Sequence, residues 1–193
     1  MMTTYRSNTF IPTFVTLSKD FAEKAGFTKS CTDDFGRLLY TLAGQEKKNI
    51  LEIGTGFGVS TAWIISAMSK DAKLVTVDID QSQVKSAIEI LGRENVEFLC
   101  GDWKDALKRG PFDLIFADVK DAKKDNAELL FESMSIGGLL ILDDLTPEEY
   151  WPDDWKGKPD KIRNFWLNHP KLAASELLLN PREAVIIASK LSV

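Results

Sequence analysis

The sequence predicts an α/β fold: a doubly wound, mostly parallel seven-stranded sheet with helices on both faces and additional N-terminal helices. Three observations support this prediction. Short apolar segments alternate with helical patterns from residue 47 onward, which is typical of a parallel sheet. These segments are continuously apolar, as strands buried on both faces are. The last two are joined by a short turn at residues 180–182, which predicts a hairpin and one antiparallel strand.

The elements follow one another along the chain with recognisable ends. A loose tail is expected over residues 1–10. Thr32 or Asp33 could cap the second helix, Gly44 is placed to end it, and Pro159 fits the first turn of the last helix. The predicted helices cover residues 14–27, 31–45, 58–70, 82–93, 103–110, 123–135 and 158–169. The predicted strands cover residues 49–54, 73–79, 95–101, 112–119, 138–144, 172–179 and 183–191.

Composition restricts the class of protein. The 193 residues are enough for one domain, with an N-terminal helical segment over 1–46 and a core over 47–193. A net charge of -5 argues against general binding to nucleic acids or membrane surfaces, since both are anionic. Cys31 and Cys100 are far apart, which indicates no disulfide framework or zinc site and favours a reducing, cytoplasmic setting. We see no secretory signal and no apolar run long enough for a membrane span.

The segment "LEIGTGFGVST", residues 51–61, joins the first core strand to the next helix. Gly54, Gly56 and Gly58 permit positive φ there and let a ligand approach the backbone. In such a sheet ligands bind at the switch point, which this turn occupies. A tight turn needed only for packing is the alternative. The dinucleotide fingerprint would need glycine at position 59, where the chain has valine.

Acidic residues near this turn favour a cationic ligand without phosphate. Glu52 precedes Gly54 by two residues, which places it at the mouth of the strand, although a capping or salt-bridge role is the alternative. Asp78 lies 20 residues after Gly58, the spacing expected of an acid that binds ribose hydroxyls. Asp80 is a helix N-cap candidate. S-adenosylmethionine (SAM) fits, because it carries an ammonium and a sulfonium and no phosphate.

The third strand ends in "LCGDW". Asp102 could contact an adenine edge, cap the following helix, or do both. Trp103 could lie beside the base or fill a gap between helix and sheet. The remaining residues of the predicted donor site are Thr55, Ser60, Ile79, Gly101 and Asp118.

With these motifs the chain resembles the class I SAM-dependent methyltransferases over residues 49–190. The motifs that carry the resemblance are "LEIGTGFGVST", "VTVDID" and "LCGDW". "FDLIFADVKD", "GGLLILDD" and the N-terminal helices make the chain similar to the catechol and caffeoyl-CoA O-methyltransferase group and its bacterial relatives. The resemblance implies a Rossmann-like methyltransferase fold and methyl transfer to a hydroxyl. Dimers are common in that group, so a homodimer is an expectation.

Three carboxylates are expected at the acceptor side. Asp118 ends the fourth strand, and Asp143 and Asp144 end the fifth, so neighbouring strands would bring them together. The resemblance implies that these three ligate a divalent cation. Oxygen ligands favour magnesium, calcium or manganese over zinc. The alternative is that these acids cap helices or pair with nearby lysines. The group has Asn where this chain has Asp144, which retains an oxygen ligand and adds charge.

A lysine three residues after the first of these carboxylates is the candidate base in the resembled group. In this chain that position is Asp121, and lysines stand at Lys120 and Lys123 instead. The candidate catalytic residues are therefore Asp118 and Lys120, with Lys123 as the alternative lysine.

The loop over residues 145–157 carries Tyr150, Trp151 and Trp155. A long loop at the ligand edge of a sheet is often a lid. We expect the three aromatic side chains to line the acceptor pocket, and anchoring of the loop on the core is the alternative.

These features together predict a SAM-dependent O-methyltransferase acting on a small, aromatic hydroxyl acceptor, with or without the help of a metal. We expect no nucleic acid or membrane partner. The main alternative is methylation of tRNA or another RNA, with a basic rim formed by Lys104, Lys108, Arg109, Lys156, Lys158, Lys161 and Arg163. A nicotinamide-dependent oxidoreductase and a non-catalytic binding protein are two further alternatives.

Overall fold

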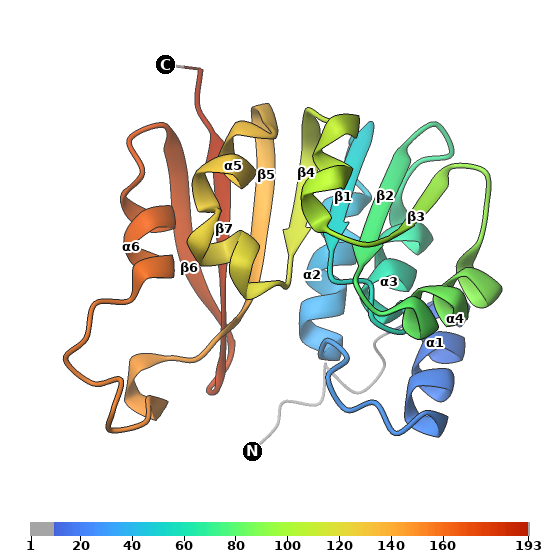
Figure 1. The fold of residues 1–193 in the computed structure, drawn as a ribbon, viewed down its shortest axis with the longest axis horizontal. Helices are drawn as coiled ribbons and strands as arrows, with labels where there is room; N and C mark the ends of the chain where they lie inside the picture. The colour runs from blue at the N-terminus through green and yellow to red at the C-terminus, as the bar shows by residue number, and fades with distance from the viewer. Residues whose placement is uncertain (1–9, 193) are drawn as a thin grey trace.

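The computed structural model describes residues 10–192 (Figure 1). Of the predicted tail, all but Phe10 lies outside the described residues. One seven-stranded sheet has the order β3-β2-β1-β4-β5-β7-β6, and only β7 runs antiparallel to its neighbours. The fold class predicted from sequence is thereby confirmed. The strands are β1 Asn49–Ile53, β2 Lys73–Asp78, β3 Val96–Cys100, β4 Phe112–Ala117, β5 Met134–Leu145, β6 Leu172–Asn180 and β7 Glu183–Lys190.

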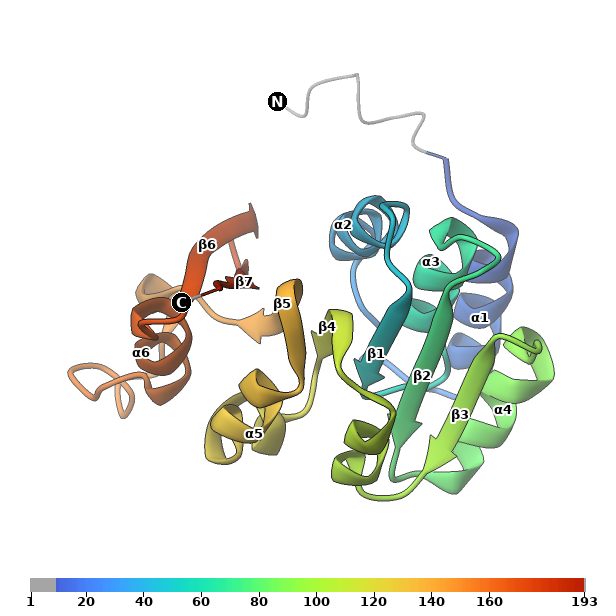
Figure 2. The ribbon, with the colours of Figure 1, turned by 90° about the horizontal axis from the view of Figure 1, so that it is seen from above.

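Helices cover both faces of the sheet, as Figure 2 shows from above. One face carries α1 Thr13–Lys24, α2 Asp33–Ala43, α3 Val59–Ala67 and α4 Gln81–Leu91. The other carries a 3-10 helix Trp103–Arg109, α5 Ala127–Glu132 and α6 Lys161–Asn168. α3 is apolar on all sides because α1 and α2 pack on its outer surface and the sheet lies beneath it. The N-terminal helices are therefore part of the core.

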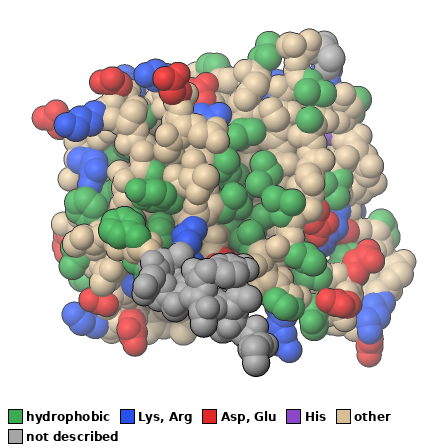
Figure 3. Space-filling view, turned by 180° about the vertical axis from the view of Figure 1, so that it is seen from behind, with side chains coloured by type: hydrophobic (Ala, Val, Ile, Leu, Met, Phe, Trp, Pro, Cys, Tyr) green, Lys and Arg blue, Asp and Glu red, His purple; other side chains and the backbone are tan. Residues whose placement is uncertain are grey.

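The face seen from behind carries exposed hydrophobic side chains (Figure 3). On α1 these are Phe14, Leu17 and Phe21. Within the described part of the chain, no helix has both the length and the apolar content that crossing a membrane would require.

Helix ends follow the predicted caps closely. The side chains of Thr32, Asp80 and Asp102 each accept hydrogen bonds from backbone N–H groups at the start of a helix. Gly44 is the C-cap of α2. These caps are predictable because they depend on local hydrogen bonding alone.

Several boundaries differ from the prediction by a few residues, and two of the differences affect the site. The helix predicted over 123–135 is instead a π-helix Asp121–Asp125 followed by the short α5. The π-helix is closed by the Asn126 N–H, which donates to the Asp121 carbonyl five residues earlier. The last helix begins at Lys161 because Asp160 caps it, so Pro159 precedes the helix.

Candidate functional site

The turn between β1 and α3 has the predicted glycine conformations. Gly54, Gly56 and Gly58 have φ values of 105°, 52° and 80°. Gly54 and Gly56 line a crevice at the carboxyl ends of the strands. A Cβ on Gly58 would lie 2.7 Å from Leu91 Cδ1 and 3.2 Å from Ala87 Cβ. Gly58 is therefore needed for packing against α4, whereas the first two glycines expose backbone to the crevice.

The crevice has a volume of about 170 Å³ and collects residues from several parts of the chain. Six of the predicted donor-site residues line it, namely Gly54, Thr55, Gly56, Ser60, Asp78 and Asp118. Residues that the sequence did not indicate also line it, namely Phe27, Lys29, Ser30, Cys31, Phe57, Val59, Gln83, Phe116 and Val119. The segment 27–31 links α1 to α2, and its contact with the crevice depends on how those helices pack. No local sequence signal could have revealed that contact.

Asp78 fixes the glycine turn. Its Oδ2 accepts a hydrogen bond of 2.8 Å from the Gly56 N–H, and its Oδ1 accepts one of 3.0 Å from the Asp80 N–H. The carboxylate is thus oriented by backbone donors while its remaining lone pairs are free for a ligand. This position at the end of β2 suits the predicted contact with ribose hydroxyls.

Glu52 does not lie at the mouth of its strand, which corrects the expectation from sequence. It is 0% exposed and lies outside the lining of the crevice. Its Oε2 accepts hydrogen bonds of 2.5 Å from Thr61 Oγ1 and 2.6 Å from Thr76 Oγ1. Thr76 Oγ1 in turn lies 2.6 Å from Oγ1 of Thr55, which lines the crevice. Burial raises the pKa of Glu52 to about 7.

The other residues predicted for the donor site follow β2 and β3 and lie outside the crevice lining. Ile79 is 84% exposed, and neither it nor Gly101, Asp102 or Trp103 lines the crevice. Asp102 caps the 3-10 helix, which was one of its two predicted roles. Trp103 is buried in the core, and its Nε1 donates a 2.9 Å hydrogen bond to Asp121 Oδ2. The structure therefore supports the gap-filling interpretation of Trp103 and corrects its assignment to the base.

The three carboxylates at the ends of β4 and β5 are neighbours, since, besides burial, the charges of Asp118 and Asp144 raise the pKa of Asp143, but they are not grouped as a metal site. Asp143 is 6% exposed and accepts a 2.7 Å hydrogen bond from the N–H of Asp144. Burial raises the pKa of Asp143 to about 7. Asp144 has a φ of 60° and an exposed side chain. Within residues 10–192, no three acidic, histidine or cysteine side chains are grouped to hold a metal ion. The predicted ligand set of Asp118, Asp143 and Asp144 is corrected accordingly.

A lysine ammonium supplies the positive charge at this position. Lys123 is 5% exposed, and its Nζ lies 3.3 Å from Asp118 Oδ1 and 2.9 Å from the Asp143 carbonyl oxygen. Trp166 Nε1 donates a 2.7 Å hydrogen bond to the Lys123 carbonyl and fixes its backbone within the π-helix. Burial raises the pKa of Asp118, and the Lys123 charge opposes that shift. Lys120, the lysine favoured from sequence, is exposed instead.

A second, larger cavity of about 500 Å³ adjoins the crevice. Lys123 lines this cavity and contacts Asp118, which lines the crevice, so the two side chains form a common wall. Trp151 and Trp155 line the cavity as predicted. Tyr150 lies outside that lining, with the guanidinium of Arg182 5.3 Å from its ring centroid. Of the three predicted aromatic residues, Tyr150 is thus the one that packs elsewhere.

Residues 51–145 match a family described as a methyltransferase domain. The protein-L-isoaspartate O-methyltransferase of Methanococcus vannielii is 33% identical over 120 residues, which cover 60% of this chain and 56% of that protein. The chain spans about half the length of the curated relatives it matches.

Solved structures share the whole architecture. The O-methyltransferase TomG of Streptomyces achromogenes, solved in complex with SAM, superposes with a TM-score of 0.81 at 20% identity over 100% of both chains. An O-methyltransferase of Bacillus cereus, solved in complex with SAH, gives a TM-score of 0.80 at 22% identity over 96% of both chains. At such identities these similarities establish the fold.

Proposed function

Because residues 51–145 match a methyltransferase-domain family and the chain shares its fold with solved O-methyltransferases, we propose that it is a SAM-dependent O-methyltransferase. The acceptor is a small, aromatic molecule with a hydroxyl group. One observation carries this proposal: a glycine-lined crevice containing two carboxylates adjoins a cavity lined by tryptophans, and Asp118 and Lys123 separate them.

The crevice suits a cationic nucleoside better than a dinucleotide. Asp78 and Asp118 both line it and would repel a pyrophosphate, whereas they attract an ammonium or a sulfonium. The backbone of Gly54 and Gly56 gives a flat surface for the amino-acid part of the donor, and Asp78 is oriented to accept ribose hydroxyls. Phe27, from the α1–α2 linker, covers the same crevice and contacts the ring of Phe57 with a centroid distance of 5.1 Å.

The bound donor supplies an activated methyl group: a carbon–oxygen bond forms as the carbon–sulfur bond breaks, and the electron pair stays on the departing sulfur. The residues of the chain position the acceptor and remove its hydroxyl proton. Asp118 accepts the hydroxyl proton, and the Lys123 ammonium stabilises the developing oxyanion. Alignment of the two reactants can contribute roughly 7–11 kcal/mol, and proton transfer adds about 10²–10⁴-fold. Positioning therefore carries most of the rate.

Metal assistance fits the residues poorly. A divalent cation would have to displace the Lys123 ammonium from Asp118, and the Asp143 carboxylate is engaged by the Asp144 N–H. We propose that Lys123 provides the positive charge in this site and that the reaction proceeds without added metal.

RNA as the acceptor is the second candidate, and the basic rim on which it rests is largely neutralised. Lys104, Lys108 and Arg109 pair with Asp121, Asp105 and Glu97, Lys156 pairs with Asp153, and Arg163 pairs with Asp160 and Glu176. A backbone-binding surface needs unpaired cations that can displace counterions. Of the rim, only Lys158 and Lys161 have no ion pair with a described residue, and both line the larger cavity, which favours a small acceptor.

Calorimetry with SAM, S-adenosylhomocysteine and NAD, each with and without magnesium, tests the proposal. We expect both sulfur nucleosides to bind, NAD to fail, and magnesium to change neither affinity. Binding of NAD alone would refute the proposed donor. A requirement for magnesium would refute the role given to Lys123. We also propose that the protein forms a homodimer and acts in the cytoplasm. Light scattering tests the dimer.

A further inference from the structure

The cavity beside the donor crevice is strongly basic, although the chain as a whole has a net charge of -5. Six basic side chains line it and only two carboxylates. The basic residues are Lys120, Lys123, Lys124, Lys158, Lys161 and Arg163. The carboxylates belong to Asp144 and Asp160.

Only two of the six cations are neutralised locally. Lys123 pairs with Asp118, and Arg163 pairs with Asp160 and Glu176. The other four have no ion pair with any residue between 10 and 192, and they are Lys120, Lys124, Lys158 and Lys161. Like charges gathered in a concave site repel one another and raise the local concentration of anions. A cavity with this charge favours the binding of an anion.

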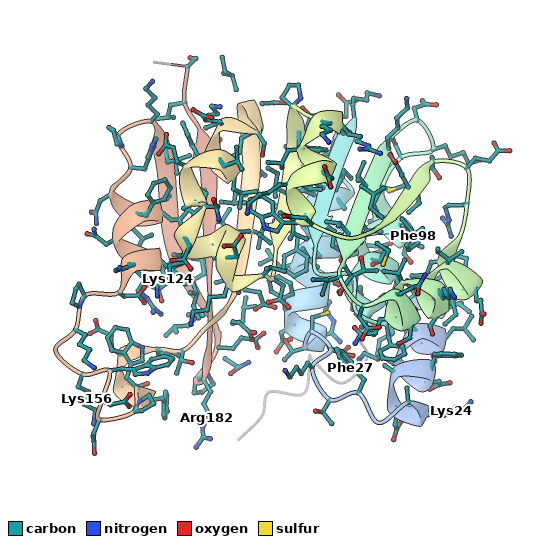
Figure 4. The ribbon with its side chains drawn as sticks, viewed as in Figure 1. Lys24, Phe27, Phe98, Lys124, Lys156 and Arg182 are labelled. Carbon is teal, nitrogen blue, oxygen red and sulfur yellow. The ribbon has the colours of Figure 1, made fainter. Side chains whose placement is uncertain are left out.

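The four unpaired lysines come from opposite sides of the cavity. Lys120 precedes the π-helix that follows β4, and Lys124 lies on it. Lys158 precedes α6, and Lys161 is its first residue. In Figure 4 Lys124 lies between the π-helix and α6, above the loop that carries Lys156. Convergence from two elements distinguishes this arrangement from a solvated charged face on one helix.

Aromatic side chains complete the lining. Trp151 is anchored by its Nε1, which donates a 2.8 Å hydrogen bond to the Thr146 carbonyl. Trp155 packs edge-on against it with ring centroids 6.3 Å apart, yet it remains 51% exposed. An anchored and a half-exposed indole offer faces for a flat ring, and about 500 Å³ is within the range of small-molecule pockets.

We propose that the methyl acceptor is an anionic aromatic compound, whose hydroxyl lies against Asp118 and Lys123 while its carboxylate or phosphate is bound by the unpaired lysines. This inference rests on the proposed methyl transfer for its direction, because the hydroxyl must face the donor crevice. The tryptophans bind the ring between the two polar ends. The charge at the far end then selects the acceptor.

A panel of matched catechols tests the charge. The compounds share the reacting ring and differ in one substituent: 3,4-dihydroxybenzoate, 3,4-dihydroxyphenyl phosphate, neutral 3,4-dihydroxybenzamide and cationic 3,4-dihydroxybenzylamine. Affinity is measured by tryptophan fluorescence, which needs no turnover, and KM by methyl transfer from SAM. We expect at least one anion to bind tenfold more tightly than the amide, the cation to bind most weakly, and the preference to shrink as salt rises. The two anions show whether carboxylate or phosphate is preferred.

Variants locate the binding site. Lys124→Gln and Lys158→Gln should each weaken binding of the preferred anion by about fivefold, the upper value for one exposed ion pair, and leave the amide unchanged. Lys156→Gln is the matched control, since Lys156 is in the same loop, pairs with Asp153 and does not line the cavity. Lys156→Gln should change neither the affinity for the preferred anion nor the affinity for the amide.

The outcomes separate this inference from the proposed function. If the amide is methylated as well as both anions, the methyltransferase stands and the anion site is refuted. If the anions bind through Lys124 and Lys158 but SAM does not bind, the anion site stands and the proposed function fails. If only an RNA oligonucleotide binds, with no response to either small anion, the acceptor class proposed here is wrong.

Discussion

Replacing Lys123 with methionine tests the ion pair that separates the two compartments. The variant keeps most of the volume of the side chain and removes its charge. At 3.3 Å and an effective dielectric of 20, two unit charges attract by about 5 kcal/mol. Dehydration of both groups offsets part of that attraction, but removing one partner leaves Asp118 unpaired and the Asp143 carbonyl without its donor. We therefore expect a loss of about 3–5 kcal/mol in the free energy of unfolding.

The loss should depend on pH. With the ammonium removed, Asp118 can avoid carrying an unpaired buried charge only by binding a proton. The loss in the free energy of unfolding is therefore larger at pH 8 than at pH 5. Urea denaturation at both values measures it. Lys124→Met is the control, because this lysine has no ion pair with a described residue and should change stability by less than about 0.5 kcal/mol. Adding Asp118→Asn to Lys123→Met should recover part of the loss. Equal stability of the two single variants at pH 8 would refute the argument.

Substitutions of Gly58, Gly56 and Glu52 test the turn and the residue beneath it, with Gly137→Ala as a control. Gly58→Ala and Gly137→Ala both place a side chain at positive φ, but only the side chain at position 58 meets a neighbour, 2.7 Å away. Gly58→Ala should therefore lower the free energy of unfolding by about 1–3 kcal/mol more than Gly137→Ala, measured by thermal unfolding. Equal losses would contradict the packing role of Gly58. Gly56→Val should abolish SAM binding in calorimetry while the circular dichroism spectrum is kept, and unchanged affinity would show that the backbone does not contact the donor. The pKa of Glu52 is raised to about 7, so its contribution to stability is complete below its unfolded pKa and is lost, by about 3 kcal/mol, as pH rises through 7. Glu52→Gln should flatten this dependence of stability on pH, measured by urea midpoints from pH 4 to 8. An unchanged slope would count against the raised pKa.

The sequence predicted those features that depend on local pattern. The order of elements follows from alternating apolar segments, and the caps Thr32, Asp80 and Asp102 follow from side chains that bond within three residues. Glu52 was misplaced because β1 is buried on both faces, so no alternation of polar and apolar residues shows which side chains point away from the ligand edge.

The lysine that contacts Asp118 was not identified from sequence for a different reason. Helix periodicity predicts contacts three or four residues apart, whereas Asp118 precedes the helical segment and is reached by Lys123 from five residues away. The linker residues Phe27 and Cys31 reach the crevice only through the packing of α1 and α2, which no motif encodes.

Asp118 is shared by two compartments, and this arrangement has a kinetic consequence. A sulfonium entering the crevice brings a second cation to a carboxylate that already holds an ammonium. The two cations would compete for the same oxygens, so under the proposed methyl transfer we expect a bound donor to loosen Lys123 and free it to engage the acceptor. A bound donor should then raise the affinity for the acceptor, whose anionic end the lysines still bind when the donor is absent.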